Sequence, residues 1–261
     1  MKHKAPSRLS RKAGMKITIF LLCFNEEALI AHTIAHYRAQ FPTCSIVIVD
    51  NGSTDRSVSI AVANRADVTF FSSGNQQQEA IMRDVRNTIW KQATDGWIIM
   101  ADMDEWLLIT EKELEEEERK GTTIITTQGF QIVGDSQTAD LTDLHFSNLR
   151  HGFLDEHFSK RVLFKIPEVD IRFGWGSHTC DPVGTVVYSE RTYLLKHMNY
   201  LGLPYLLEKH RRRYARNEHS RSRGMNGHYL NDPAAVQREY ESLARDPMPS
   251  LNDPRLSQIN Q

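Results

Sequence analysis

Short apolar runs alternate with longer amphipathic segments over the first hundred residues. Four runs rich in Ile, Val, Leu, Phe or Trp are typical of buried strands and lie at 17–23, 46–49, 68–71 and 97–101. Between them, apolar residues recur three and four apart, which predicts helices over 26–40, directly after the turn 50–55, and over 76–93. This β-α-β-α order predicts a mainly parallel sheet flanked by helices.

The pattern changes after residue 108. Thr110 and Glu113 form a capping box ahead of a short acidic helix. The polar stretch 134–158 has a length that suggests a functional loop. Further strands are expected at 122–133, 161–165 and 185–195, and further helices at 204–218 and from Asp232-Pro233 onward.

Three polar clusters follow the predicted strands directly: Asn25 to Glu27, Asp50 to Asp55, and Asp102 to Glu105. Ligands of parallel α/β sheets bind at the carboxyl ends of the strands, so these clusters predict one binding site. The cluster at 50–55 is also compatible with a simple Asx-type turn followed by a helix cap supplied by Ser53 or Thr54.

Asp102 and Asp104 are two residues apart on an extended backbone, so their side chains should project together. Two like charges about 4 Å apart repel by roughly 4 kcal/mol at an effective dielectric constant near 20. A divalent cation with a preference for hard oxygen ligands, such as Mn²⁺ or Mg²⁺, would offset that repulsion. The alternative is a solvated acidic turn.

Composition narrows the class of protein. Of 261 residues, 40% are hydrophobic and 25% charged, and the formal net charge is −1, so no overall charge attracts nucleic acid or an anionic membrane. Three scattered cysteines, Cys23, Cys44 and Cys180, favour a reducing compartment over a disulfide framework or a structural zinc site. No apolar run approaches the about 20 residues that span a bilayer.

The chain resembles the family 2 glycosyltransferases of the GT-A fold through three strings in order: ITIFLLCFNEEALI, IVIVDNGSTDRSV and WIIMADMDEWL. The likeness is strong over about 15–110. It continues more weakly to about 240 through FSKRVLFKIP, GWGSHTCDPVG and LLKHMNYLG, which are similar to bacterial members acting on surface polysaccharide. The resemblance implies an α/β fold with a single Rossmann-like, mainly parallel mixed sheet and a basic helical C-terminal extension.

The polar ends of the chain, together with the resemblance, predict a division of the chain. A flexible basic tail is expected at 1–14, a glycosyltransferase domain at 15–200, a helical extension at 201–246 and a polar tail at 247–261. Within the domain, 15–110 would be the nucleotide-binding half and 111–200 the acceptor half.

Site residues follow from the resemblance by position. Asp50 would accept a hydrogen bond from the nucleobase, and Asn51 stands where the family usually has a second acid. Gly52 would permit the turn. The residues expected to bind the nucleotide-sugar are Asn25, Glu26, Asp50, Asn51, Gly52, Arg83, Asn87 and Asp102. The alternative for Arg83 and Asn87 is a surface salt-bridge face shared with Glu79 and Asp84.

Asp104 would bind Mn²⁺ or Mg²⁺ directly, with Asp102 at the ribose or a metal-bound water, and His178 or His197 would be the third ligand. A lone histidine is more often structural. The catalytic base is expected among Asp155, Glu156 and Asp181. A basic run is expected to bind phosphate, contact a membrane surface or form a solvated helix face: Lys209, Arg211, Arg212, Arg213 and Arg216.

The expected function is metal-dependent transfer of a sugar from a UDP-, GDP- or dTDP-linked donor to a glycan or lipid-linked acceptor, with inversion. Nucleic acid is not an expected partner. The expected location is the cytoplasm, at the inner face of the membrane if the basic run binds lipid. The alternatives are a sugar nucleotidyltransferase and a non-catalytic module that binds glycan or nucleotide. The first would need a glycine-rich phosphate loop, which residues 23–26 lack.

Overall fold

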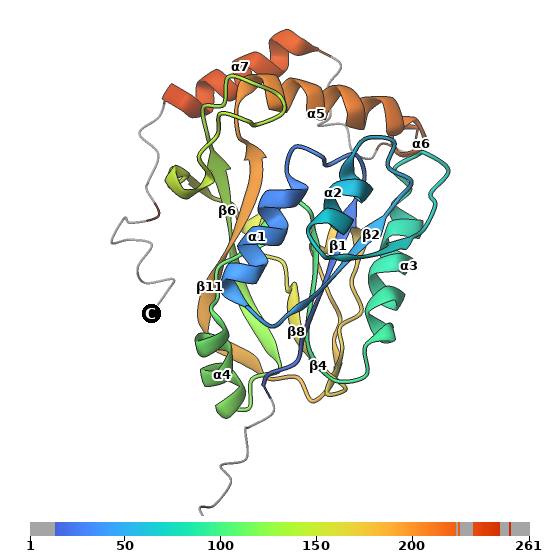
Figure 1. Cartoon of the computed structure of the whole chain (residues 1–261), viewed down its shortest axis with the longest axis vertical. Helices are drawn as coiled ribbons and strands as arrows, with labels where there is room; N and C mark the ends of the chain where they lie inside the picture. Colours follow the sequence, from blue (N-terminus) through green and yellow to red (C-terminus); the bar gives the residue numbers. More distant parts are fainter. Residues whose placement is uncertain (1–13, 223, 225–231, 246–250, 252–261) are drawn as a thin grey trace, which may run out of the picture.

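A computed structural model describes residues 14–222, 224, 232–245 and 251 of the chain (Figure 1). The tail predicted for 1–14 lies outside the described residues apart from Gly14. The tail predicted for 247–261 lies outside them apart from Leu251.

The first half of the chain forms four neighbouring parallel strands at one end of a nine-stranded sheet. Its strands lie in the order β3-β2-β1-β4, and each neighbouring pair is parallel. The bounds are β1 (Ile17–Cys23), β2 (Ser45–Asp50), β3 (Asp67–Phe70) and β4 (Gly96–Asp102). The four strands predicted from the apolar runs are therefore confirmed.

The second half extends this sheet in the order β4-β8-β6-β11-β5. The pairs β4–β8, β8–β6 and β11–β5 are antiparallel, whereas β6–β11 is parallel, so the sheet is mixed. β7 also pairs with β6, and β9 with β10 forms a separate small sheet. The bounds are β5 (Glu105–Leu107), β6 (Ile124–Val133), β7 (Gly152–Leu154), β8 (Leu163–Ile166), β9 (Val169–Asp170), β10 (Val183–Gly184) and β11 (Tyr188–Tyr200).

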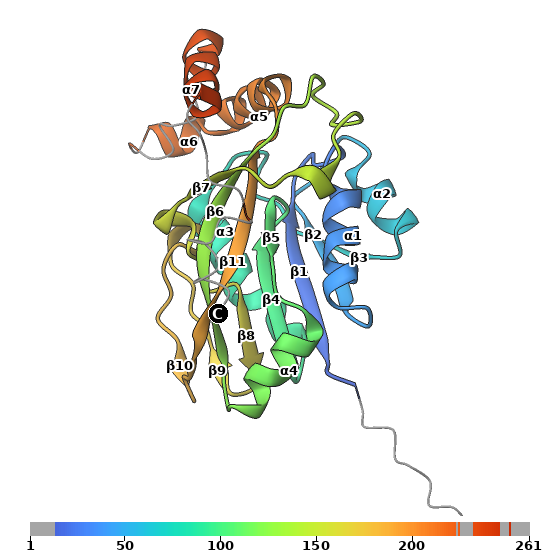
Figure 2. The same cartoon turned by 90° about the vertical axis from the view of Figure 1, so that its left-hand side faces the viewer.

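Alternation along β1 divides the core between the two faces of the sheet. Ile19 and Leu21 pack in the cluster that contains Ile34 of α1 (Ile30–Gln40). Phe20 and Leu22 face the other way, in a cluster against which α3 (Glu79–Thr88) packs. In Figure 2, α1 and α2 (Ser57–Ala63) accordingly lie on one side of the sheet and α3 on the other. A 3₁₀ turn (Ile89–Gln92) follows α3.

Three helix starts differ from the prediction, and one of them is α3, which begins at Glu79 rather than 76. α1 begins at Ile30 rather than 26, and α2 begins at Ser57 without a side-chain cap. Neither Ser53 nor Thr54 caps α2, because the Ser53 hydroxyl donates to Asp50 and the Thr54 N–H donates to Asn25. These hydroxyl residues stabilise the turn itself.

Two of the remaining helices begin with the N-terminal caps that the sequence predicted. α4 (Glu111–Arg119) starts with the Thr110–Glu113 capping box, which is confirmed. Asp232 accepts hydrogen bonds from the N–H groups of Ala234 and Ala235 at the start of α7 (Pro233–Arg245). α5 (Leu203–Arg216), α6 (Glu218–Arg221) and α7 lie over the end of the sheet where β1 and β4 terminate (Figure 1). Of the helices in the described ranges, none has both the length and the apolar character needed to cross a membrane.

Candidate active site

Two adjoining cavities lie between the carboxyl ends of β1 and β4 and the helix α5. The smaller has a volume of about 100 Å³ and the larger about 570 Å³. Five residues line both of them: Gln77, Arg86, Asp102, Asp104 and Arg213. The acidic cluster after β4 thus lies at the boundary between the two cavities, and the prediction that Asp102 and Asp104 project to one place agrees with this geometry.

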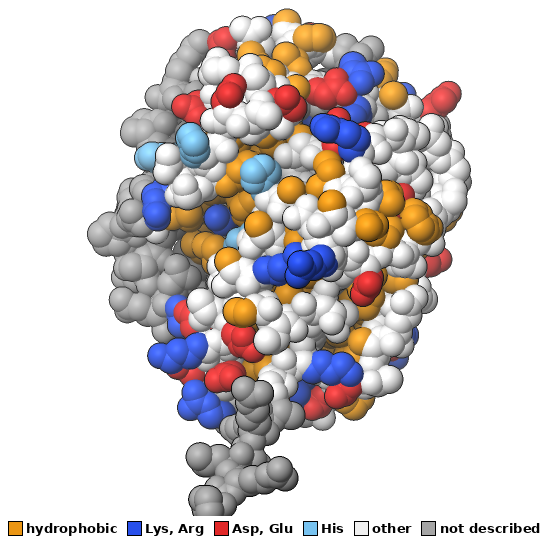
Figure 3. Space-filling view, in the orientation of Figure 1, with side chains coloured by type: hydrophobic (Ala, Val, Ile, Leu, Met, Phe, Trp, Pro, Cys, Tyr) orange, Lys and Arg blue, Asp and Glu red, His pale blue; other side chains and the backbone are white. Residues whose placement is uncertain are grey.

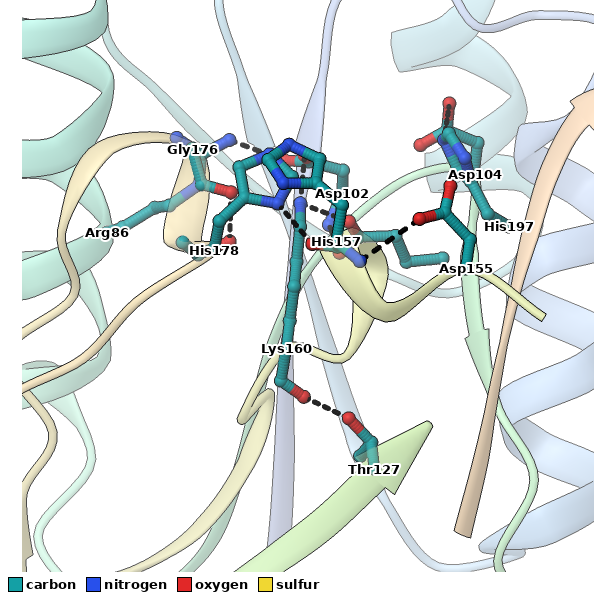
Figure 4. Close-up of polar contacts among 12 residues, drawn as sticks. Arg86, Asp102, Asp104, Thr127, Asp155, His157, Lys160, Gly176, His178 and His197 are labelled. Atoms are coloured by element: carbon teal, nitrogen blue, oxygen red, sulfur yellow. Dashed lines mark hydrogen bonds and ion pairs between the residues drawn. The ribbon is translucent and has the colours of Figure 1, made fainter. Parts of the chain in front are cut away.

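Asp102 is neutralised by two basic side chains from different elements. Arg86 Nη2 on α3 donates to Asp102 Oδ1 at 2.7 Å, and Lys160 Nζ lies 3.6 Å from Oδ2. Burial alone would raise the pKa of Asp102, but these two cations outweigh it and lower that pKa to about 2. Figure 4 shows Asp102 beside Arg86, His157 and His178. The carboxylate is therefore ionised at neutral pH.

Glu105 contacts both the backbone of Asp102 and the side chain of Lys160. Its Oε2 accepts the backbone N–H of Asp102 at 3.0 Å, and Lys160 Nζ donates to its Oε1. Both Glu105 and Lys160 are buried. Lys160 therefore bridges two carboxylates of the cluster and holds the turn after β4 in place.

Asp104 contacts a second set of basic side chains. Its Oδ2 lies 2.7 Å from Lys209 Nζ, 3.6 Å from Arg213 Nη2 and 3.3 Å from His197 Nε2. Burial by itself would raise the pKa of Asp104, but the charge of Lys209 outweighs it and holds that pKa well below its usual range. Burial lowers the pKa of His197. Asp104 is thus ionised beside a histidine that favours the neutral form.

The pair Asp104 and His197 fits a divalent cation better than the other predicted ligands do. A carboxylate oxygen and an imidazole nitrogen face each other there, at the wall of the larger cavity. No group of three or more His, Cys, Asp or Glu side chains in the described ranges is arranged to hold a metal. Mg²⁺ is often bound by one or two carboxylates, with substrate phosphates and water completing the shell, so a site with few protein ligands is compatible with such an ion.

His178 has a different environment. Its Nδ1 lies 2.7 Å from the backbone oxygen of His157, and the two imidazole rings stack with centroids 3.8 Å apart. Burial lowers the pKa of His178 to about 4. It lines the larger cavity without an ion pair to Asp104 among the described contacts.

The predicted nucleotide residues divide into those that line the smaller cavity and those that build the turn. Asn51 and Glu26 line it, and burial raises the pKa of Glu26. Asp50 is not among the residues lining it, because its carboxylate accepts from Gly52 N, Ser53 N and the Ser53 hydroxyl. Gly52 has φ +76°, which the turn requires.

Asn25 also builds this loop. Its side-chain oxygen accepts the N–H of Thr54 at 2.7 Å, and Thr54 Oγ1 accepts from its amide nitrogen at 3.2 Å. Asn25 has φ +54°, a left-handed conformation that asparagine tolerates better than most residues. The structure therefore gives Asn25 a part in joining the loop after β1 to the turn after β2.

On α3, the structure brings a different arginine to the site from the one predicted. Arg83 pairs with Asp84 at the surface, and Asn87 exchanges hydrogen bonds with the backbone of Phe173. Neither lines the two cavities, whereas the buried Arg86 does. The face of α3 that meets the sheet is set by packing, so the spacing of polar residues alone did not identify Arg86.

The basic run on α5 is split by the helix into two faces. Arg212, Arg213 and Arg216 line the smaller cavity, and the Arg216 guanidinium lies 3.2 Å from the centroid of the Phe24 ring. Arg211 is exposed and pairs with Glu208 on the same helix. On the face of the protein shown in Figure 3, Lys and Arg are interspersed with Asp and Glu. The inward arginines give the smaller cavity a strongly positive wall.

Of the three predicted bases, one faces the cavity. Asp155 lines the larger cavity, and its Oδ2 accepts from Gln131 Nε2 at 2.9 Å. Glu156 and Asp181 are exposed and are absent from the lining of both cavities. Gln131, which the motifs did not indicate, also lines the larger cavity.

Comparisons with known proteins indicate the family of this chain. A family model described as glycosyl transferase family 2 matches residues 18–172. The protein RfbJ of Shigella flexneri is 38% identical over 48 residues, which are 18% of this chain and 37% of that protein. The chain thus matches just over a third of the length of this curated relative.

Solved structures with related folds are more distant. TarS of S. aureus has a TM-score of 0.47 at 14% identity, over 70% of this chain and 37% of TarS. The mannosyltransferase PcManGT of Pyrobaculum calidifontis, solved with GDP-Man and Mn²⁺, has a TM-score of 0.35 at 17% identity, over 44% of this chain and 36% of that protein.

Proposed function

Because the chain belongs to glycosyl transferase family 2, we propose that it transfers a sugar from a nucleoside-diphosphate donor to a glycan or lipid-linked acceptor. One observation supports this more than any other: Asp102 and Asp104 line both a small arginine-walled cavity and a large polar one. The small cavity suits an anionic diphosphate, and the large one has room for the sugar and the attacking acceptor.

The donor would bind through its charged and hydrogen-bonding groups. Arg213 and Arg216 offer fork-shaped donors to the diphosphate oxygens. Asn51 and Glu26 also line this cavity, where the nucleoside would lie, with Asp102 near the ribose. UDP, GDP and dTDP all present the diphosphate that this site would recognise.

Asp104 and His197 would hold Mn²⁺ or Mg²⁺, with Lys209 giving up its contact to Asp104 when the cation binds. A bound cation would neutralise the charge that develops on the leaving diphosphate. Arg86 and Lys160 keep Asp102 ionised, and Glu105 fixes the backbone that carries both aspartates. These contacts pre-organise the carboxylates before any ligand arrives.

Asp155 is the proposed base for an inverting reaction. The acceptor hydroxyl would attack the anomeric carbon from the larger cavity while its proton passes to the Asp155 carboxylate. Asp155 Oδ1 accepts the His157 N–H at 3.0 Å and Oδ2 accepts from Gln131, which leaves further lone pairs facing the cavity.

Calorimetry with UDP, GDP and dTDP, each with and without Mn²⁺, tests this proposal. We expect one nucleotide to bind at least about tenfold more tightly when Mn²⁺ is present. Asp104→Asn should abolish the Mn²⁺-dependent gain, whereas Asp140→Asn, at an exposed loop carboxylate, should retain it. If no nucleotide binds in the presence of metal, the enzyme assignment is wrong; if binding is equal with and without Mn²⁺, only the metal role fails.

A further inference from the structure

Gln131 connects two of the proposed site residues. It is buried on β6, its Oε1 lies 2.9 Å from His197 Nδ1, and its Nε2 donates to Asp155 Oδ2 at 2.9 Å. A carboxylate oxygen accepts hydrogen bonds, and Asp155 Oδ2 accepts from the amide nitrogen of Gln131. The amide oxygen of Gln131 therefore faces His197.

The orientation of Gln131 determines where His197 carries its proton. An amide oxygen is only an acceptor, so the ring nitrogen that faces it, Nδ1, must be the N–H. Nε2 of the neutral ring then presents a lone pair to Asp104 Oδ2, 3.3 Å away. Two acceptors that face each other form no hydrogen bond, but they are suitably placed to share a cation.

We propose that Gln131 is a positioning residue that holds His197 in the Nδ1–H tautomer, with Nε2 free to bind a divalent cation together with Asp104, and that Asp155 orients Gln131. The metal part of this inference rests on the proposed function. Metal-binding histidines commonly donate their second N–H to an oxygen acceptor, which fixes the tautomer and the ring orientation. Gln131 supplies that acceptor here.

The fold places the three side chains in a row. Gln131 and His197 are direct register partners of the parallel pair β6–β11. Asp155 follows β7, which pairs with the other edge of β6, and its backbone N–H donates to Gly129 O at 2.9 Å. A Cβ on Gly129 would lie 2.4 Å from Asp155 O, so glycine permits this close approach. Adjacent strands therefore build the connection.

An aromatic ring restrains the histidine from its other side. The Phe158 ring stacks on the His197 ring with centroids 4.1 Å apart. Rotation of the imidazole out of its present plane would break this stacking, and a half-turn within the plane would lose the hydrogen bond to Gln131. His197 therefore has one favoured orientation before any cation binds.

The tautomer can be read without a metal by long-range ¹H–¹⁵N correlation spectra of His197 at about pH 8, where an ordinary histidine is neutral. We expect the Nδ1–H form in the wild type. In Gln131→Leu the proton should move to Nε2, where it can donate to Asp104. An Nε2–H or doubly protonated ring in the wild type, or an unchanged spectrum in Gln131→Leu, would overturn the assignment.

Mn²⁺ affinity provides the second measurement. Gln131→Leu should weaken Mn²⁺ binding by about 10–100-fold, the usual effect of losing such a supporting contact. Gln128→Leu makes the same chemical change on the same strand, at a side chain whose amide nitrogen donates to Gly129 O at 3.3 Å, and should leave Mn²⁺ affinity unchanged. Equal losses in the two variants would contradict the role of Gln131.

A paired exchange separates positioning from general disruption. In the double variant Gln131→Glu, Asp155→Asn, the side-chain amide at 155 would donate to the carboxylate at 131, the reverse of the wild-type hydrogen bond. The other carboxylate oxygen at 131 would still accept from His197 Nδ1. We expect this double variant to recover the Nδ1–H tautomer and the Mn²⁺ affinity that Gln131→Leu loses. If it binds Mn²⁺ as weakly as Gln131→Leu, the inference fails. A wild type with the Nδ1–H tautomer but no Mn²⁺ affinity would overturn the metal role and support the tautomer assignment.

Discussion

Lys209 Nζ lies 2.7 Å from Asp104 Oδ2, although the two residues are 105 positions apart in the sequence. Both side chains are buried, and Lys209 Nζ also donates to Asn199 Oδ1 at 2.7 Å. The ion pair joins α5 to the acidic cluster after β4. α5 therefore contributes directly to the candidate active site.

Removing Lys209 should destabilise the metal-free protein and favour the metal-bound one. In Lys209→Met the buried Asp104 carboxylate loses the cation 2.7 Å from its Oδ2. Breaking a buried ion pair by removing one partner typically lowers the free energy of unfolding by about 3 kcal/mol or more. The same change removes a competitor for Asp104, so Mn²⁺ affinity should rise. Urea unfolding with EDTA or Mn²⁺ measures both effects, with the exposed Lys112→Met as the control. Equal stability of Lys209→Met and wild type in EDTA would contradict this prediction.

Arg86 and Arg83 should differ sharply when each is replaced by glutamine. Arg86→Gln removes the cation 2.7 Å from Asp102, so we expect sugar transfer to fall at least about 100-fold. Arg83→Gln disturbs an exposed contact with Asp84 and should stay within about twofold of the wild type. Steady-state transfer rates with the donor identified by calorimetry distinguish the two. If Arg83→Gln lost more of the transfer rate than Arg86→Gln, the sequence-based prediction that Arg83 binds the nucleotide-sugar would be favoured.

The three candidate bases can be ranked by their amide variants. Asp155→Asn should lower kcat at least about 100-fold, because the acceptor hydroxyl loses its proton acceptor, while donor affinity measured without metal is retained. Glu156→Gln and Asp181→Asn lie outside the cavities and should stay within about twofold of the wild type. Rapid-quench transfer assays with saturating donor provide the measurement. Normal transfer by Asp155→Asn would exclude it as the base.

Lys196 should make stability depend on alkaline pH. Its Nζ lies 5.6 Å from the centroid of the Trp106 ring, and burial, with the charge of Arg150, lowers its pKa from 10.5 to about 8. Between those two values the Lys196 side chain binds more protons in the unfolded chain than in the folded one, so its contribution to the stability of the wild type should rise with pH over that window and remain flat below it.

Lys196→Met removes this titration. A shift from 10.5 to about 8 corresponds to up to about 3 kcal/mol, so the variant should be more stable than the wild type at neutral pH by up to that amount. The difference should vanish near pH 10.5. Chemical denaturation across this pH range tests it, and parallel stability curves for the two proteins would contradict it.

Local patterns determined much of the fold and the general place of the site. Short apolar runs predicted β1 to β4, because an extended chain with nonpolar side chains on both faces must be covered on both sides. The same runs placed Asp102 and Asp104 at a strand end, which is a consequence of chain order alone. The capping box at Thr110 and Glu113 likewise depends on contacts within one turn.

Only the tertiary structure decided which partners meet the acidic cluster. Lys160 reaches Glu105 because β8 pairs with β4, and Lys209 reaches Asp104 because α5 lies over the end of the sheet. Gln131 meets His197 through strand register. These contacts join residues 55, 105 and 66 positions apart, and their geometry is set by packing of whole elements, which short-range periodicity does not encode. The sequence by itself determined where negative charge gathers, and the folded chain decided which side chains neutralise, orient and expose it.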